Sequence, residues 1–139
     1  MYSKYIISDR TTIRAALVVL NNVSGETMSL LVVDDKQQMV GSLSDGDIRR
    51  GIINGGNLED KVETIMHRDY KYLEEKDYDV AHLKAFRERR ILFIPILDEE
   101  RHIVDVVNLQ KFKSHLPVDA VLMAGGKGER LRPLTEKTP

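Results

Sequence analysis

The sequence contains no cysteine and only nine glycines and four prolines among its 139 residues. Without cysteine the chain has no disulfide, thiol nucleophile or thiolate metal site, which is typical of a reducing compartment, and we expect a cytoplasmic protein. The low glycine and proline content excludes collagen-like and mucin-like chains. The 42% of hydrophobic residues indicates an ordinary folded protein. Length alone predicts one domain.

An excess of one charge and a long apolar run are also lacking. The 21 Lys and Arg residues against 22 Asp and Glu residues give a net charge of −1, so no global positive field would hold nucleic acid. The longest apolar runs, Ala15–Leu20 and Ile91–Leu97, fall far short of the roughly 20 residues of a membrane-spanning helix. The first residues lack the pattern of a secretory signal. We therefore expect no nucleic-acid partner, no membrane span and no secretion.

The chain contains two similar halves. A shift of 64 positions places residues 30–34 on residues 94–98 and residues 39–40 on residues 103–104, and the apolar positions coincide. Further upstream the matching shift is 67, so the first half carries about three extra residues around Val23–Thr27. Ser24 and Gly25 in this insertion indicate a loop.

Each half predicts the same order of elements, α-β-β-α. Apolar residues at helical spacing predict the helices, and short β-branched runs around a polar turn predict a hairpin. The expected elements of the first half are a helix at Ile13–Asn22 capped by Thr12, strands at Leu30–Val33 and Met39–Leu43, and a helix that Ser44 caps and Asn54-Gly55-Gly56 ends. Those of the second half are a helix at Val80–Arg89, strands at Leu92–Leu97 and Ile103–Val107, and a helix from Asn108. A unit of about 60 residues is marginal alone, so we predict an α+β fold in which the two repeats pack sheet to sheet.

This pattern resembles a tandem pair of CBS domains, the ligand-sensing modules attached to many enzymes and transporters. The resemblance rests on the element order, on Ile94-Pro95-Ile96-Leu97-Asp98, on Val62-x-x-Ile65-Met66 at the start of the second repeat, and above all on Gly41-x-x-Ser44-Asp45-Gly46-Asp47. We place the first repeat at residues 1–60 and the second at residues 61–117.

The resemblance implies a nucleotide site where the second strand of the first repeat enters its helix. In CBS domains the aspartate of this motif accepts hydrogen bonds from ribose hydroxyls, and here it is Asp47. Ser44 and the free amides of the helix start would face phosphate, Arg49 or Arg50 could add charge-assisted bonds, and Gly41 would let the backbone approach the ligand. An adenine nucleotide such as AMP or ATP, or a sugar nucleotide, is the expected ligand.

A second interpretation of the same residues needs no ligand. Ser44 and Asp47 have the spacing of an N-cap and the third helical residue, so they could simply cap the helix. In the second half the matching positions hold Asp105, Asn108 and Lys111, so the capping residue remains while the glycine and the carboxylate are gone. We expect at most one nucleotide site, in the first repeat. No metal site is predicted: Asp45-Gly46-Asp47 lacks the order of a calcium loop, and the four histidines (His67, His82, His102 and His115) are scattered.

The character of the chain changes after Pro117. Val118–Ala124 reads as a buried strand that leads into a glycine loop with Gly125, Gly126 and Gly128. This loop is neither a Walker A loop, since no Ser or Thr follows Lys127, nor the dinucleotide-binding fingerprint. Residues 124–135, Ala-Gly-Gly-x-Gly-x-Arg-Leu-x-Pro-Leu-Thr, closely resemble the opening of sugar-phosphate nucleotidyltransferases. In that family the loop holds a nucleoside triphosphate, the arginine, here Arg130, stabilises charge on the phosphates, and Mg²⁺ assists.

Taken together, these resemblances predict the regulatory CBS pair of a larger sugar-1-phosphate nucleotidyltransferase, cut just inside its catalytic domain. Residues 118–139 would be the first strand and glycine loop of that domain, and we expect no transferase activity and no catalytic residue in this chain. The pair would bind its ligand, form a homodimer and modulate the attached domain, for which Mg²⁺ is the expected cofactor. Two alternatives remain: a structural dimerisation module without ligand, and a parent protein whose sugar-nucleotide synthesis is the function that matters.

Overall fold

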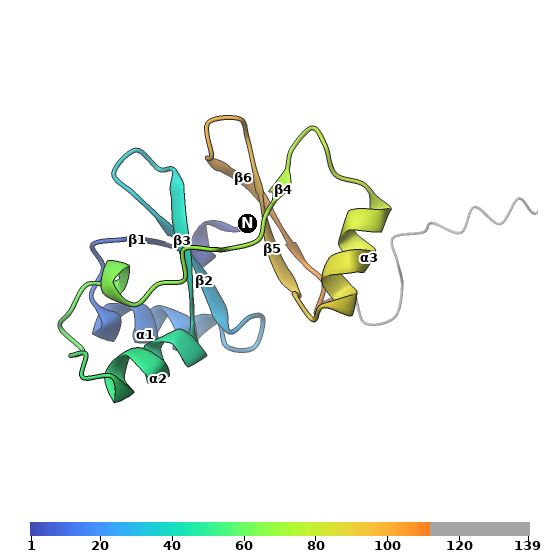
Figure 1. Cartoon of the computed structure of the whole chain (residues 1–139). Coiled ribbons are helices and arrows are strands. Elements are labelled where there is room, and N and C mark those ends of the chain that lie inside the picture. Colours follow the sequence, from blue (N-terminus) through green and yellow to red (C-terminus); the bar gives the residue numbers. More distant parts are fainter. Residues whose placement is uncertain (112–139) are drawn as a thin grey trace, which may run out of the picture.

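A computed structural model describes residues 1–111 of the chain. The first repeat contains η1 (Ser3–Tyr5), β1 (Ile6–Ser8), α1 (Ile13–Val23), β2 (Ser29–Val33), β3 (Met39–Ser44) and α2 (Asp45–Ile53). The second contains η2 (Val62–Thr64), β4 (Leu73–Glu74), α3 (Val80–Glu88), β5 (Phe93–Leu97) and β6 (Ile103–Asn108). Each repeat has one small sheet; the two sheets face each other in the middle, with α1 and α2 on one outer side and α3 on the other (Figure 1).

The predicted helices form where the sequence places their caps. The Thr12 side chain accepts a hydrogen bond from the amide of Ala15 at 3.2 Å and so starts α1. The Asp79 side chain accepts from the amide of His82 at 3.0 Å and starts α3 in the same way. One face of α1 is buried against the first sheet, through Ile13, Ala16, Leu20 and Val23.

Both sheets have one strand more than the sequence predicted. β1 pairs in parallel with β2, and β4 pairs in parallel with β5, so the strand orders are β1-β2-β3 and β4-β5-β6. The repeat is therefore β-α-β-β rather than α-β-β before its last helix. The helix expected from Asn108 does not begin there: Asn108 ends β6, residues 109–111 form a turn, and the rest of that expected helix lies outside the described residues.

The two hairpins match each other in register as the internal repeat predicted. Val32 pairs with Gly41 in the first, and Ile96 pairs with Asp105 in the second. Each hairpin also has a register shift at the same place, after Val32 and after Ile96. Each turn contains a non-glycine residue with positive φ, Gln37 at 63° and Arg101 at 69°.

Side chains of β2 alternate between two cores. Leu30 and Val32 point to α1 and α2 and belong to the core of the first repeat, while Leu31 and Val33 face the second sheet. There they pack with Leu97 and other side chains of the hairpin β5–β6, which confirms the predicted packing of sheet to sheet. A third cluster lies between the second sheet and α3. Within residues 1–111 no helix is long and apolar enough to cross a membrane.

Candidate functional site

The predicted nucleotide motif lies at the junction of β3 and α2. Ser44 is the N-cap of α2, and its side chain accepts from the amide of Asp47 at 3.2 Å. The Asp47 carboxylate in turn accepts from the Ser44 amide at 2.8 Å and from the Ser44 hydroxyl at 2.6 Å. The pair therefore forms a capping box, as the interpretation without ligand predicted, and this leaves Asp47 largely buried.

The two candidate arginines are held by carboxylates of their own helix. Arg50 donates to the second carboxylate oxygen of Asp47 at 2.6 Å, and Arg49 donates to Asp45 at 2.5 Å. Burial raises the pKa of Asp47, but the hydrogen bonds from Ser44 and from Arg50 outweigh it, so the pKa lies below its usual value. The site thus brings Ser44, Asp47 and Arg50 together as a charged, hydrogen-bonded group, while Arg49 belongs to a separate pair.

Close packing, rather than a bound group, occupies the space beside Gly41. A Cβ atom at residue 41 would lie 2.7 Å from the sulfur of Met66 and 3.2 Å from the carbonyl oxygen of His67. The segment that links the two repeats lies here, because the amide of Ser42 donates to the carbonyl of His67 at 2.9 Å. The expected role of Gly41 in ligand approach stays a prediction, since the linker segment already accounts for the glycine.

A surface hollow of about 480 Å³ lies beside the buried carboxylate. Asp47, Arg50 and Gly51 of α2 form one wall, and the chain that follows α2 forms the other, through Asn54, Gly55, Gly56, Asp60, Thr64 and Ile65. The hollow offers two carboxylates, a guanidinium and three glycine backbones to a ligand. These are groups that suit the hydroxyls and phosphates of a nucleotide.

The corresponding position of the second repeat makes a different set of contacts. Lys111, which matches Asp47, donates to the Glu26 carboxylate of the first repeat at 2.6 Å. Asn108, which matches Ser44, donates from its side-chain amide to the Glu26 carbonyl at 2.8 Å. Instead of a carboxylate open to a ligand, this position holds a lysine bonded to the other repeat.

Glu26 joins the two repeats at this position, and the sequence did not single it out. Its carboxylate also accepts from Lys4 and from the Tyr5 hydroxyl, so four side chains from both repeats meet there; we call this group the Glu26 cluster (Lys4, Tyr5, Glu26 and Lys111). Hydrogen bonds lower the pKa of Glu26 to about 2; the bond from Lys111 has the largest effect, followed by those from Lys4 and Tyr5. The sequence held two signs of this contact: the insertion at Val23–Thr27, which contains Glu26, and a lysine at position 111 where the first repeat has an aspartate. Only the structure shows that Glu26 and Lys111 are bonded to each other.

No group of three or more metal-ligating side chains occurs in residues 1–111. Three histidines lie in this part of the chain and are apart from one another; His102 contacts the opposite repeat, at the carbonyl oxygen of Lys36. His115 and the glycine-loop residues lie outside the described residues, and so does the predicted domain at 118–139; the loop residues are Gly125, Gly126, Gly128 and Arg130.

Comparison with known proteins agrees with this geometry. Residues 2–54, which include the motif from Gly41 to Asp47, match the family model of the CBS domain. The chain is also similar to the arabinose 5-phosphate isomerase GutQ of Escherichia coli (strain K12), with 31% identity over 81 residues, 58% of this chain and 25% of that protein. The chain thus spans about a quarter of the length of the curated relatives that it matches first.

Solved structures are similar in fold over about four fifths of this chain. The CBS pair of a putative Mg²⁺ transporter from Shewanella oneidensis MR-1 is similar with a TM-score of 0.67 and 16% identity, over 80% of this chain and 63% of that one. The CBS domains of a transcriptional regulator from Streptococcus pneumoniae give a TM-score of 0.64 and 13% identity, over 78% and 86% of the two chains. The chain therefore has the fold of a CBS domain pair.

Proposed function

We propose that the chain is a regulatory module that binds a nucleotide at the hollow beside Asp47. The observation that supports this most is the location of that carboxylate: it is buried on one side by the capping box and borders a hollow of about 480 Å³ on the other. A ligand in this hollow would lie directly against the carboxylate. The expected ligand is an adenine nucleotide or a sugar nucleotide.

The contacts of Asp47 suggest how the ligand would be held. The two hydroxyls of a ribose can donate to the carboxylate oxygen that now accepts from Arg50 at 2.6 Å. Arg50, of which 68% of the side chain is exposed, would then be free to bind phosphate. Ligand binding would exchange an ion pair within α2 for bonds between α2 and the nucleotide. If the nucleotide binds one arrangement of the two repeats more tightly than another, it would favour that arrangement and so bias the attached domain.

Thermal melting with a set of nucleotides tests the proposal. We expect one of AMP, ATP, GTP, CMP or a sugar nucleotide, at about 100 times its Kd, to add roughly 2.7 kcal/mol and raise the melting temperature by several degrees. Asp47→Asn keeps the acceptor oxygen of the cap but removes the charge, and it should lose most of this shift. Asp45→Asn, which breaks the neighbouring ion pair with Arg49 on the same helix, should retain it.

Two results would contradict the nucleotide site. One is the absence of a shift with every nucleotide of the set. The other is the same shift in Asp47→Asn as in the unaltered chain, which would leave the capping box as the whole role of the motif.

The partner domain that we propose is an enzyme acting on sugar phosphates. Residues 124–135 have the glycine-loop pattern of sugar-1-phosphate nucleotidyltransferases, for which Mg²⁺ would be the cofactor, and the relatives at about 30% identity are named as isomerases of a sugar phosphate. A cytoplasmic location fits both. Pyrophosphate release by a longer form of the protein, supplied with a sugar 1-phosphate and a nucleoside triphosphate, would support the transferase; isomerase activity alone would exclude it.

A second candidate function is dimerisation, and one observation favours it. Several large apolar side chains on and after the helices of the first repeat are exposed, with Ile53 at 76% and Val18 at 59% the most exposed of those on the helices. A homodimer that covers them would leave the nucleotide site optional. Analytical ultracentrifugation distinguishes the two functions. A purely structural module is favoured if Ile53→Ser weakens the association of the chains and no nucleotide changes it.

A further inference from the structure

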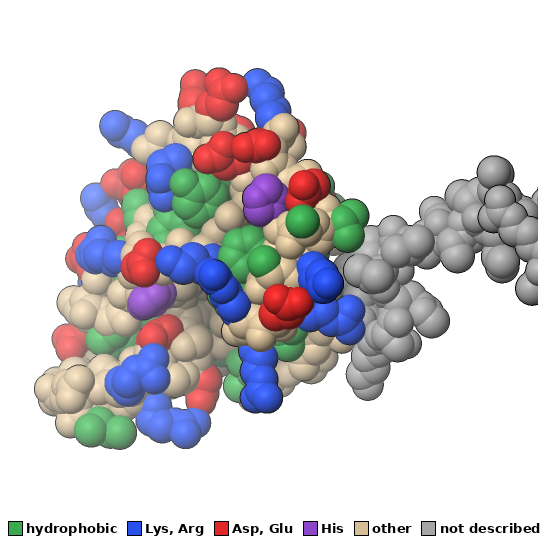
Figure 2. Space-filling view, turned by 45° about the vertical axis from the view of Figure 1, so that its right-hand side comes forward, with side chains coloured by type: hydrophobic (Ala, Val, Ile, Leu, Met, Phe, Trp, Pro, Cys, Tyr) green, Lys and Arg blue, Asp and Glu red, His purple; other side chains and the backbone are tan. Residues whose placement is uncertain are grey.

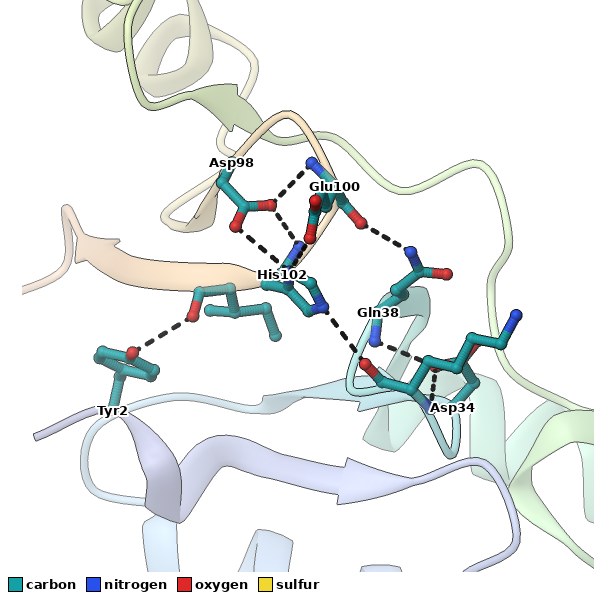
Figure 3. Close-up of polar contacts among 8 residues, drawn as sticks. Tyr2, Asp34, Gln38, Asp98, Glu100 and His102 are labelled. Atoms are coloured by element: carbon teal, nitrogen blue, oxygen red, sulfur yellow. Dashed lines mark hydrogen bonds and ion pairs between the residues drawn. The ribbon is translucent and has the colours of Figure 1, made fainter.

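The turns of the two hairpins meet at one end of the paired sheets. Residues 34–38 of the first repeat and residues 98–102 of the second lie side by side (Figure 3). The Gln38 side chain donates to the Glu100 carbonyl at 2.9 Å, and the Met39 amide donates to the Arg101 carbonyl at 2.9 Å. These two bonds join the repeats at any pH, because neither donor titrates near neutrality.

The imidazole ring of His102 adds a contact of another kind. Its Nδ1 lies 3.2 Å from a carboxylate oxygen of Asp98, and its Nε2 lies 3.2 Å from the carbonyl oxygen of Lys36 in the opposite turn (Figure 3). Both neighbours can only accept a hydrogen bond. A neutral imidazole has a single N–H and so leaves one ring nitrogen facing an acceptor, whereas the protonated ring donates to both.

We propose that His102 is a proton-dependent clasp between the two repeats. When the ring is protonated, it bonds its own turn through Asp98 and the opposite turn through Lys36 at the same time. When the ring is neutral, one of these bonds is lost. The contact between the repeats is therefore stronger when the ring carries its second proton, and it weakens when the ring releases that proton. This inference is independent of the proposed nucleotide site.

Charged groups from both turns surround the ring. From its own turn, His102 faces the carboxylates of Asp98 and, at 3.6 Å, of Glu100. The opposite turn carries Asp34, whose carboxylate accepts from two amides of that turn, and the exposed side chain of Lys36. Arg101 is bonded to a tyrosine hydroxyl and stacked on tyrosine rings. The closest charged groups to the ring are thus carboxylates.

Asp98 remains charged over the whole relevant range. The His102 amide donates to it at 2.8 Å, and this bond, together with further bonds from the turn, lowers the pKa of Asp98 below its usual value. Of the two groups in this contact, the imidazole is therefore the one whose proton decides whether both bonds form.

Thermal melting of the full 139-residue chain at pH 6 and at pH 8 tests the clasp. Between pH 6 and pH 8 the melting temperature of the unaltered chain should fall by a few degrees more than that of His102→Gln, because glutamine carries no proton to release. His67→Gln is the matched control, since the His67 side chain is exposed and has no hydrogen bond within residues 1–111; it should behave like the unaltered chain.

Hydrogen exchange at one amide shows whether the effect lies between the repeats. The Met39 amide is bonded across the junction, so its protection factor, corrected for the intrinsic rate, should fall severalfold in His102→Gln at pH 6 and little at pH 8. Asp98→Asn should give the same pattern. An equal pH dependence of melting in His102→Gln and the unaltered chain, or an unchanged Met39 protection factor, would overturn the proposal.

Discussion

Gly51 shows at the scale of one residue how closely α2 approaches the linker. A Cβ atom there would lie 2.5 Å from the Cγ2 atom and 3.1 Å from the Cβ atom of Ile65. Gly51→Ala would gain about 1 kcal/mol of helix propensity, but we expect the collision to outweigh it, with a net loss of about 1–3 kcal/mol in the free energy of unfolding. Denaturation in urea measures this loss.

Two further variants separate the collision from other effects of the substitution. Gly25→Ala is the matched control, because no atom lies within 4 Å of a Cβ added there, and it should change stability by less than about 0.5 kcal/mol. Ile65→Ala combined with Gly51→Ala should restore part of the loss. A Gly51→Ala protein as stable as the original would show that α2 can move away from Ile65 at no cost.

The residues of the candidate site were only partly predictable. Ser44 and Asp47 have a spacing that defines a capping box, and the structure contains it. Glu26 could not be found in this way, since its partners Lys4 and Lys111 lie 22 and 85 positions away and no local pattern links them. Contacts of this kind depend on how the repeats pack, which spacing within one element does not reveal.

At the scale of elements, β1 is the strand that completes the first sheet. It is three residues long, and Ile7 at its centre is 7% exposed, paired with Val32 of β2 and part of the core of the first repeat. Ile7→Ala should cost about 2–5 kcal/mol in the free energy of unfolding, because it leaves a cavity under the helices. Val18→Ala, at a position that is 59% exposed, should cost less than about 0.5 kcal/mol in the same denaturation experiment.

The outcome of that comparison bears on the role of β1. If Ile7→Ala were as mild as Val18→Ala, the strand would be an appendage rather than part of the sheet. The sequence did not predict β1 or β4 because three and two residues are too few to show an alternation of period two. The helices α1 and α3, by contrast, have caps and several turns of apolar spacing, and the predicted bounds differ from the observed ones by a single residue at the C-terminal end.

At the scale of the whole molecule, the Glu26 cluster ties the beginning of the chain and the end of the second repeat to the loop after α1. Because the pKa of Glu26 is lowered from 4.5 to about 2, its contribution to stability is complete above about pH 4.5 and is lost as the pH falls toward 2. Glu26→Gln should therefore have a lower melting temperature than the unaltered chain at pH 7. On acidification to about pH 3, its melting temperature should fall by less than that of the unaltered chain.

Glu88→Gln serves as the control for this prediction. Within residues 1–111 the Glu88 carboxylate has no hydrogen bond or ion pair. Its replacement should therefore change neither the melting temperature at pH 7 nor the fall of the melting temperature between pH 7 and pH 3. An equal fall of the melting temperature on acidification in Glu26→Gln and in the unaltered chain would show that the cluster does not contribute to stability. Acidic and basic side chains are mixed over the face seen in Figure 2, so other surface pairs should contribute little.

The paired irregularities of the two hairpins speak to the origin of the molecule. A register shift after Val32 and after Ile96, and a left-handed residue at Gln37 and at Arg101, occupy equivalent places in the two repeats. In each turn an aspartate carboxylate, that of Asp34 or Asp98, accepts from the amides two and four residues further on, and this shared pattern holds the left-handed residue in place. Duplication of one ancestral gene segment would copy the aspartate, the left-handed residue and the register shift together. The chain is thus best understood as a tandem duplicate whose halves kept their backbone, while the equivalent positions 47 and 111 hold side chains of opposite charge.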